Sequence, residues 1–312
     1  MRTIGIDIGG TEIKAGIVDD TGAILRASRR DSEPRDPEEL IRRVVELVDE
    51  LSGDAPVGAL GIGVPGLIAA GTGTLLRAPN MPGIDGTNLG DRIGGETGLP
   101  TLIRNDADLN AWGEFRAGAG IGTRHMICLT VGTGLGSGMI IGGQLHAGAT
   151  GYGAEAGHIV VEPGGRSCGC GGQGCLETIV SATGIVARAS DRIRSGEPTI
   201  LVEAGLTAQK VHDAAAGGDA VALAVYSEVG RFLGIGCATL MNLVNPELIA
   251  IGGGVSAAGD LLLGPAIKEA RHRAYPEVFA ACRIEQARLG VEAGVVGAGL
   301  LAAEMVPERR TD

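Results

Sequence analysis

The sequence predicts an α/β protein with two domains, and three observations support that prediction. Apolar, β-type runs alternate with helical repeats along 312 residues, a length that is large for one hydrophobic core. A glycine-rich stretch at 118–123 marks a shift in composition. A hairpin pattern begins each half, near residues 3 and 126, which indicates a duplicated domain plan.

Strand and helix signals alternate through the first half. The apolar runs 3–8 and 13–18 form the first hairpin. Apolar residues recur with helical spacing over 36–51, after Asp36-Pro37 and before Gly53. We expect further elements in this order: a strand over 59–64, a helix over 89–97, a strand over 101–103 and a helix over 109–117.

The second half begins with an uncharged stretch, 126–143, which is long enough for a membrane span. Its six glycines and its Thr, Val and Ile residues favour a strand–turn–strand instead. We expect helices over 179–195, 211–217, 220–243, 259–273 and 293–305, and strands over 248–251 and 284–287.

Composition limits the partners. A net charge of −11 disfavours nucleic acid or an anionic membrane as the main partner. The first residues enter a strand pattern at once, without the apolar region of a signal peptide, which predicts a cytoplasmic protein. Cys128, Cys237 and Cys282 are isolated in apolar surroundings, as reduced core thiols are.

A group of metal-ligand residues is the most informative pattern in the chain. His158, Cys168, Cys170 and Cys175 fall within 18 residues and form the ligand set of a closed Cys₃His zinc site. Glycines around the thiols let the backbone wrap tightly around an ion. The alternatives are three buried structural cysteines or a disulfide framework, and the missing secretory signal disfavours the latter.

Two carboxylates, Glu155 and Glu177, flank this group. A closed zinc site needs no further ligands, so we interpret both as polar groups whose positions the metal loop fixes. With His158 they would surround a polyol, whose buried hydroxyls each need a partner. Asn80 follows a proline and could contribute, although a turn residue is the simpler interpretation.

A candidate phosphate site follows the first predicted strand. The turn Gly9-Gly10-Thr11 exposes backbone N–H groups and a hydroxyl to one point. Asp7 is placed to hold Mg²⁺ directly or through water, and Lys14 could supply positive charge. An ordinary turn is the alternative.

Two more glycine-rich turns extend this hypothesis. Gly132-Thr133-Gly134, in the second hairpin, has more glycine nearby than a turn requires, and two such hairpins could clamp a polyphosphate. Gly252-Gly253-Gly254, between a strand and a helix, would suit a nucleotide. Neither a Walker A loop nor a Rossmann fingerprint follows the first strand.

Asn105-Asp106 stands where a strand meets a loop. A carboxylate there can accept a hydroxyl proton during phosphoryl transfer. The alternative role is a helix N-cap, for which we favour the neighbouring Asp108.

Together these motifs resemble the ROK family of sugar kinases and sugar-responsive regulators, over about residues 3 to 303. The resemblance rests on five motifs: Asp7-x-Gly-Gly-Thr11, Asn105-Asp106-Ala, Val131-Gly-Thr-Gly134, Glu155-x-Gly-His158 and Cys168-x-Cys170-Gly-x-x-Gly-Cys175-Leu-Glu177. It implies an actin-like ATPase fold of two ribonuclease-H-like α/β domains with a cleft between them. The implied domains are residues 1–117 plus 293–312 and residues 118–292, the latter carrying the zinc loop.

The resemblance also implies roles. Asp106 is then the catalytic base, and the sugar ligands are Asn105, Glu155, His158 and Glu177. Zinc would be held by His158 and the three cysteines, ATP with Mg²⁺ would be the donor, and the protein would be a homodimer or homotetramer.

The leading hypothesis for activity is ATP-dependent phosphorylation of glucose at its 6-hydroxyl. Asp108 and the stretch Met81–Ile84 depart from the family pattern, so mannose, fructose and N-acetylated hexosamines stay as alternative acceptors. Inorganic polyphosphate stays as an alternative donor, although the acidic composition argues against it. A sugar-sensing regulator is the rival, but the first hairpin begins at residue 3 and leaves no room before it for a DNA-binding domain.

Overall fold

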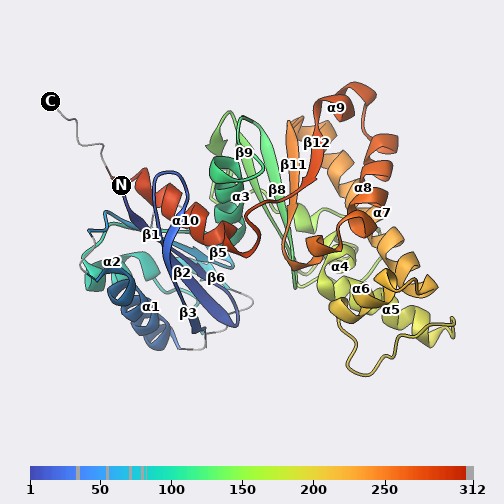
Figure 1. Cartoon of the computed structure of the whole chain (residues 1–312), viewed down its shortest axis with the longest axis horizontal. Helices are drawn as coiled ribbons and strands as arrows, with labels where there is room; N and C mark the ends of the chain where they lie inside the picture. The colour runs from blue at the N-terminus through green and yellow to red at the C-terminus, as the bar shows by residue number, and fades with distance from the viewer. Residues whose placement is uncertain (33–35, 54–55, 70–71, 79–80, 82, 307–312) are drawn as a thin grey trace. The chain divides into compact units, whose positions relative to one another are not determined.

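The computed structural model describes residues 1–32, 36–53, 56–69, 72–78, 81 and 83–306 (Figure 1). A five-stranded sheet lies in the N-terminal half, with the order β3 (Ile24–Asp31), β2 (Glu12–Val18), β1 (Thr3–Ile8), β4 (Leu60–Val64) and β7 (Thr101–Asn105). The first three strands are antiparallel neighbours, whereas β4 and β7 continue the sheet in parallel. The predicted first hairpin is confirmed, and β3 is an additional edge strand.

A second five-stranded sheet has the order β10 (Gln144–Leu145), β9 (Leu135–Ile141), β8 (Met126–Val131), β11 (Leu248–Gly252) and β12 (Arg283–Gln286). Strands β8, β11 and β12 are parallel, as β1, β4 and β7 are. The second sheet thus repeats the first, which confirms the predicted duplication. Strands β5 (Leu67–Ile68) and β6 (Leu75–Arg77) form a small separate sheet.

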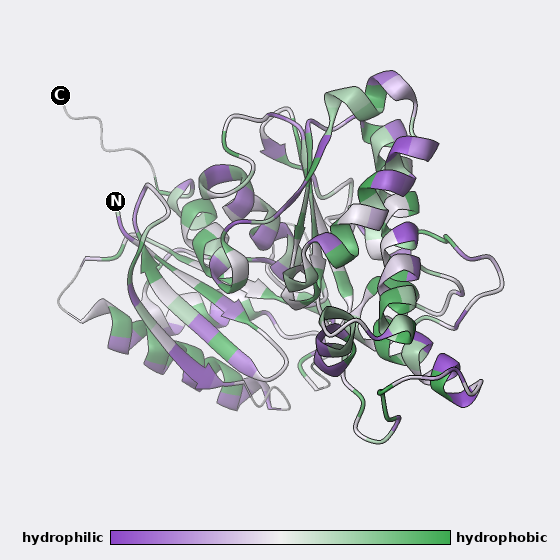
Figure 2. Cartoon of the chain, turned by 45° about the vertical axis from the view of Figure 1, so that its right-hand side comes forward, coloured by the Kyte–Doolittle hydropathy of each residue, from purple (hydrophilic) through white to green (hydrophobic). Residues whose placement is uncertain are grey.

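Four helices accompany the first sheet: α1 (Pro37–Ser52), α2 (Leu89–Thr97), α3 (Asp106–Ala117) and α10 (Ala293–Ala303). Helix α1 begins because the Asp36 side chain accepts a hydrogen bond from the Glu38 N–H, with Pro37 in the first turn. Its Leu40, Val44 and Leu47 are fully buried, and Figure 2 shows hydrophilic residues on its other side.

Helix α10 comes from the far end of the chain and packs against β1, β4 and α3. Its sequence, AGVVGAGLLAA, consists of small and aliphatic residues, and nearly all of them are buried. Small side chains let the helix backbone approach the sheet closely. The C-terminal helix therefore completes the core that the first hairpin begins.

The second sheet is accompanied by α4 (Glu177–Val180), α5 (Ala182–Arg194), α6 (Ala208–Ala216), α7 (Ala220–Val244), α8 (Asp260–Arg273) and α9 (Pro276–Ala281). The predicted helix over 179–195 is interrupted at Ser181, whose hydroxyl accepts the Gly184 N–H and begins α5. Short 3₁₀ turns are η1 (Ala156–His158), η2 (Gly254–Ala258) and η3 (Gly290–Glu292). Helix α7 has the length and composition of a membrane span, but it packs against α8, α6 and α5 as a core helix.

The chain divides into two compact units. The first comprises Met1–Gly122, Gly138–Ala154 and Arg288–Asp312, and the second comprises Thr123–Ser137 and Glu155–Ala287. The predicted domain boundaries, 1–117 plus 293–312 and 118–292, stay a prediction.

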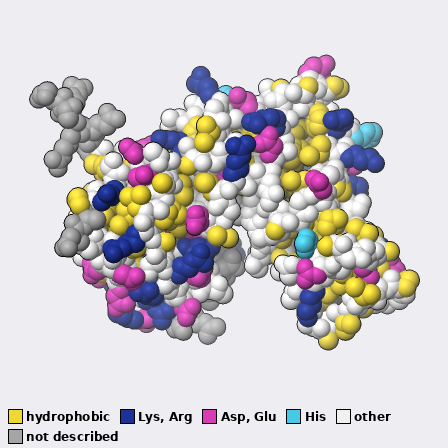
Figure 3. Space-filling view, viewed as in Figure 1, with side chains coloured by type: hydrophobic (Ala, Val, Ile, Leu, Met, Phe, Trp, Pro, Cys, Tyr) yellow, Lys and Arg dark blue, Asp and Glu magenta, His cyan; other side chains and the backbone are white. Residues whose placement is uncertain are grey.

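On the face drawn in Figure 3, acidic and basic side chains are interspersed over the described residues.

Candidate active site and metal cluster

The first hairpin turn lies between β1 and β2. The Gly9 N–H donates to the Glu12 carbonyl over 2.9 Å, and Gly10 at the tip is exposed. Asp7 and Lys14 are paired residues on the two strands, so both lie on one face of the sheet. Burial raises the pKa of the Asp7 carboxyl, and the charge of Lys14 lowers it. The structure thus places an acid and a cation beside an exposed glycine turn.

Glu12, the first residue of β2, has a basic neighbour that sequence reasoning missed. Its Oε2 lies 3.5 Å from Nη1 of Arg29 on β3, so the carboxylate faces a guanidinium. Arg29, Arg30, Glu12 and Asp31 line an open depression of about 290 Å³ beside the hairpin. Arg26, Arg29 and Arg30 hide this edge strand in the sequence, because they interrupt the alternation of apolar and polar residues.

Asn105, the last residue of β7, is the N-cap of α3. Its Oδ1 accepts hydrogen bonds from the N–H groups of Ala107 and Asp108, over 2.8 and 3.4 Å. Its Nδ2 donates to the Gly66 carbonyl over 3.0 Å. The prediction that Asp108 caps this helix is wrong: Asp108 is buried within the first turn, and the side chain at the strand end reaches the free N–H groups first.

Asp106 is the first residue of α3, immediately after β7, and is half-buried. Its Oδ1 accepts the Ala107 N–H over 3.0 Å, and its backbone carbonyl accepts from Asn110 Nδ2 over 2.8 Å. The helix start therefore fixes this carboxylate at the end of the strand. Asn80, the other candidate sugar ligand in this unit, lies outside the described residues.

The second hairpin turn, Gly132–Gly134, is held from the start of α5 and from α4. The Ala182 N–H donates to the Gly132 carbonyl over 2.8 Å, and Thr183 Oγ1 donates to the Thr133 carbonyl over 3.3 Å. Glu177 Oε2 accepts the Leu135 N–H over 2.8 Å. Sequence reasoning missed Thr183, although the cap-like Ser181 that precedes it could have indicated a helix start here.

The third glycine turn adjoins the second. Strands β8 and β11 are parallel neighbours, with Gly252 paired to Thr130, so both turns lie at the carboxyl ends of their strands. Gly253 has φ +81°, and a Cβ there would lie 2.3 Å from the Val131 carbonyl oxygen. Only glycine fits this position, because the turn packs directly on the strand that leads into the second hairpin.

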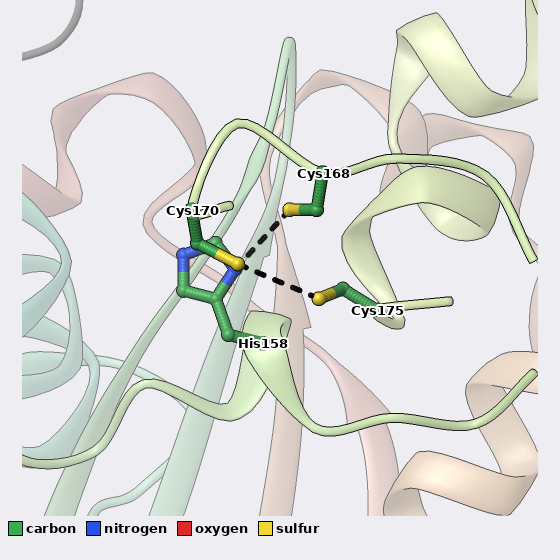
Figure 4. Close-up of side chains that lie close together, drawn as sticks. All are labelled: His158, Cys168, Cys170 and Cys175. Carbon is green, nitrogen blue, oxygen red and sulfur yellow. Dashed lines mark hydrogen bonds between the residues drawn. The ribbon is translucent and has the colours of Figure 1, made fainter. Parts of the chain in front are cut away.

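The four predicted metal ligands converge, as Figure 4 shows. One ligand atom from each of His158, Cys168, Cys170 and Cys175 lies within 4.8 Å of the others. Cys170 Sγ lies 3.7 Å from Cys175 Sγ, and Cys168 Sγ lies 3.6 Å from His158 Nδ1. Thiolates about 2.3 Å from a tetrahedral zinc ion lie about 3.8 Å apart, so the cluster fits zinc.

The two flanking glutamates face this cluster. Glu155 Oε2 lies 3.9 Å from His158 Nε2, on the ring nitrogen that is not directed at Cys168. Burial raises the pKa of Glu155, the neighbouring His158 lowers it, and the charge of Glu177 raises it. Glu177 Oε1 lies 3.7 Å from Cys168 Sγ. The second unit thus brings together Glu155, His158, Glu177, the three cysteines and two glycine turns.

The first unit holds the other predicted residues: Asp7, Gly9, Gly10, Thr11, Lys14, Asn105 and Asp106. A cavity of about 410 Å³ in this unit, beside α2 and β7, is lined by none of them. The predicted site residues therefore fall into two groups, one in each compact unit.

The two five-stranded sheets have the same strand order, and each begins with a hairpin whose turn is rich in glycine. This arrangement defines a protein of the actin-like ATPase class. The profile described as ROK family matches residues 3–305, so the chain belongs to the ROK family. It is 37% identical to a glucokinase of Streptomyces coelicolor over 98% of each chain, and 38% identical to a glucokinase of Halalkalibacterium halodurans over 96% of this chain and 94% of the relative.

Among solved structures, the chain is similar to a ROK family glucokinase from Streptomyces griseus in complex with glucose and AMPPNP. The TM-score is 0.85 and the identity 38%, over 97% of this chain and 100% of the other.

Proposed function

We propose that this protein is a glucokinase, which transfers the γ-phosphoryl group of ATP to the 6-hydroxyl of glucose. The observation that carries the proposal is the position of Glu177, whose carboxylate lies beside both the His158–cysteine cluster and the second glycine hairpin. One unit thereby has polar groups for a sugar next to backbone groups for phosphate. The similarity to glucokinases along the whole chain supports glucose as the acceptor.

Asp106 is the proposed catalytic base. Its carboxylate accepts the proton of the 6-hydroxyl while that oxygen attacks the γ-phosphorus, and the bond from γ-phosphorus to the bridging oxygen breaks to release ADP. Asp106 belongs to the first compact unit, whereas Glu155, His158 and Glu177 belong to the second.

The glycine hairpins are the proposed phosphate sites. In the turns Gly9–Thr11 and Gly132–Gly134, the N–H groups of Gly9 and Gly132 donate within the turn, and the other backbone N–H groups would bind phosphoryl oxygens. Lys14 would neutralise part of the phosphate charge. Mg²⁺, when bound, would supply the charge that offsets the leaving phosphates, and Asp7 is the residue that would hold it. Gly252–Gly254 would accommodate the nucleoside end, because this turn adjoins the second hairpin.

Zinc is the metal that the cysteine cluster would hold, with a structural role. It would fix the loop that carries Glu177 and the imidazole of His158, so that both present polar atoms to the sugar. His158 would bind the ion through Nδ1, which leaves Nε2 to donate a hydrogen bond. We further propose that the protein acts in the cytoplasm, where it would supply hexose phosphate to glycolysis, as a homodimer or homotetramer.

The test is ATP consumption by the purified protein with Mg²⁺ and, in turn, glucose, mannose, fructose, N-acetylglucosamine and N-acetylmannosamine. We expect the highest kcat/KM with glucose. A higher kcat/KM with another sugar would reassign the acceptor, and no turnover with any of them in a folded, metal-loaded sample would refute the kinase.

A further inference from the structure

A row of charged side chains runs across the first sheet beside its glycine turn. Asp7 of β1 is paired with Lys14 of β2, and Lys14 is paired with Arg29 of β3, so these side chains lie on one face of the sheet. Glu12 stands two residues before Lys14 on the same strand and therefore shares this face. The opposite face of β2 carries Ile13, which is fully buried in the core. The charged face thus continues from the proposed phosphate turn to the edge strand β3.

The guanidinium of Arg29 is directed toward the turn. Its Nη1 lies 3.5 Å from Oε2 of Glu12, the residue that directly follows Thr11 of the turn. The Ser32 N–H donates to the Thr11 carbonyl over 2.9 Å, which holds the end of β3 against the turn. The side chains of Arg29 and Glu12 are 55% and 39% exposed. A phosphate chain that leaves the turn on this side therefore meets both charges.

The surface beside this ion pair is an open depression of about 290 Å³ with balanced charge. Two acids and two bases line it: Glu12, Asp31, Arg29 and Arg30. Arg30 is paired with Ile13 across the strands, so it lies on the opposite face, where its guanidinium forms an ion pair with Glu50 of α1. Arg29 is therefore the cation on the side of the turn, and Glu12 neutralises it.

We propose that Glu12 is a specificity-determining residue for the phosphoryl donor, whose carboxylate keeps inorganic polyphosphate from replacing ATP. The inference rests on the proposed function, in which the first glycine turn binds phosphoryl oxygens of the donor. ATP ends in a nucleoside beyond its three phosphates and needs no further cation beside the turn. A polyphosphate carries negative charge on every further phosphate, and a carboxylate beside its path repels it. Without the charge of Glu12, Arg29 would extend the phosphate site along β3.

The reaction with polyphosphate would be the same phosphoryl transfer. The 6-oxygen of glucose would attack the terminal phosphorus, and the bond from that phosphorus to the bridging oxygen would break. The bonding electrons leave with a chain that is one phosphate shorter, and the hydroxyl proton passes to Asp106. The donor is thus selected by the charges beside the turn and not by the reacting groups.

The experiment compares wild type with Glu12→Gln, with linear inorganic polyphosphate and Mg²⁺ in place of ATP. Glutamine keeps the size of the side chain and removes its charge. We expect kcat/KM for polyphosphate to rise about tenfold and kcat/KM for ATP to change less than about threefold, because one repulsive charge is lost and one cation is released. Calorimetric titration with polyphosphate in the absence of sugar should show the same gain in affinity. High salt should reduce that gain, since both side chains are partly exposed.

Glu50→Gln is the matched control. Glu50 also forms an ion pair with an arginine of β3 and is comparably exposed, but it belongs to α1 on the opposite face of the sheet. It should leave the constants for both donors unchanged. The double variant Glu12→Gln/Arg29→Gln should lose the gain of the single variant, because the released cation is then absent.

Three results would overturn the inference: a wild-type preference for ATP in Glu12→Gln, an equal gain with polyphosphate in Glu50→Gln, or a gain that persists in the double variant. Wild type that uses polyphosphate as well as ATP would overturn it too. Absence of glucose turnover with ATP in the wild type would instead refute the proposed function. The calorimetric affinities for polyphosphate would in that case still test the role of the Glu12–Arg29 ion pair.

Discussion

The Glu177 carboxylate accepts the backbone N–H of Leu135 over 2.8 Å. The residue that ends the cysteine motif therefore holds the second glycine hairpin, and its other oxygen lies 3.7 Å from Cys168 Sγ. Through this one side chain, the proposed metal site and a proposed phosphate site share a structural element. The arrangement explains why a kinase of this kind would carry a structural metal next to its active site.

Glu177→Gln should raise the KM for both glucose and ATP, since it weakens a sugar ligand and loosens the hairpin. Glutamine can still accept the Leu135 N–H, but a hydrogen bond to a neutral oxygen is weaker by about 1 kcal/mol than one to a carboxylate, equivalent to about fivefold in affinity. Glu155→Gln, which leaves the hairpin bond intact, should raise only the KM for glucose. Initial rates with each substrate varied in turn give both constants. Equal effects of the two variants on the KM for ATP would contradict the proposal that Glu177 holds the second glycine hairpin in place.

Removal of the metal should destabilise the loop around Cys168–Cys175. We expect one zinc per chain by elemental analysis, and a lower melting temperature with weaker glucose binding after chelation. Cys170→Ser should reproduce the metal-free protein. Cys282→Ser, which alters a buried thiol outside the cluster, should keep its zinc. Full zinc occupancy in Cys170→Ser would show that the ligand set is wrong.

The metal cluster and the glycine hairpins were predictable from sequence because their residues are close together in the chain. His158 and the three cysteines span 18 residues, and each hairpin joins adjacent strands. Strand β3 was not predicted, because its arginines obscure the alternation of an edge strand with one solvated face. The cap of α3 was misassigned because Asn105, Asp106 and Asp108 are all good caps, and only the backbone path decides among them.

Long-range contacts were out of reach of local patterns. Glu114 of α3 reads as an ordinary helical glutamate, and its burial and its hydrogen bonds from the N–H groups of Arg288 and Leu289 become visible only in the fold. The ion pair of Glu12 with Arg29 likewise becomes visible only once β3 is placed beside β2. Such contacts depend on topology, which periodicity and spacing do not specify.

Gly294→Ala should impair the first phosphate site. A Cβ at this position of α10 would lie 2.8 Å from Asp7 Cγ, so either the carboxylate or the helix must move. Overpacking of this kind costs about 1–3 kcal/mol of stability, and we expect the KM for Mg²⁺–ATP to rise with it. Gly264→Ala in α8 is the control, because a Cβ there meets no atom within 4 Å. Normal kinetics and stability in Gly294→Ala would show that the packing on Asp7 is looser than described.

Glu247, whose Oε2 accepts the N–H groups of Arg124 and His125 over 2.6 and 2.8 Å, should make stability depend on pH. The N–H groups of Arg124 and His125 lower the pKa of this carboxyl from its ordinary 4.5. A lowered folded-state pKa means that its stabilisation is fully present above pH 4.5 and is lost as the pH falls through the folded value. Urea denaturation from pH 6 to 3 gives the unfolding free energies of wild type and Glu247→Gln. The difference between the two should become smaller as the pH falls. A difference that becomes larger toward low pH would contradict a lowered pKa of Glu247 in the folded protein.

Asp106→Asn should abolish most turnover while leaving glucose binding intact. A positioned general base contributes about 10²–10⁴ in rate, so kcat should fall by that range. Asparagine can still accept the Ala107 N–H through its side-chain oxygen, so α3 should keep its start. Calorimetric titration with glucose would show whether binding survives. A kcat of Asp106→Asn within tenfold of the wild-type value would show that another residue is the catalytic base.

The most direct test of the central claim is identification of the product that the wild-type protein forms from glucose and Mg²⁺–ATP. Phosphorus NMR, supported by a coupled assay with glucose-6-phosphate dehydrogenase, reports both the sugar phosphate and its position. Our account predicts one glucose 6-phosphate for each ADP formed. Phosphate at another hydroxyl, or ADP formed with free phosphate and no sugar phosphate, would contradict it.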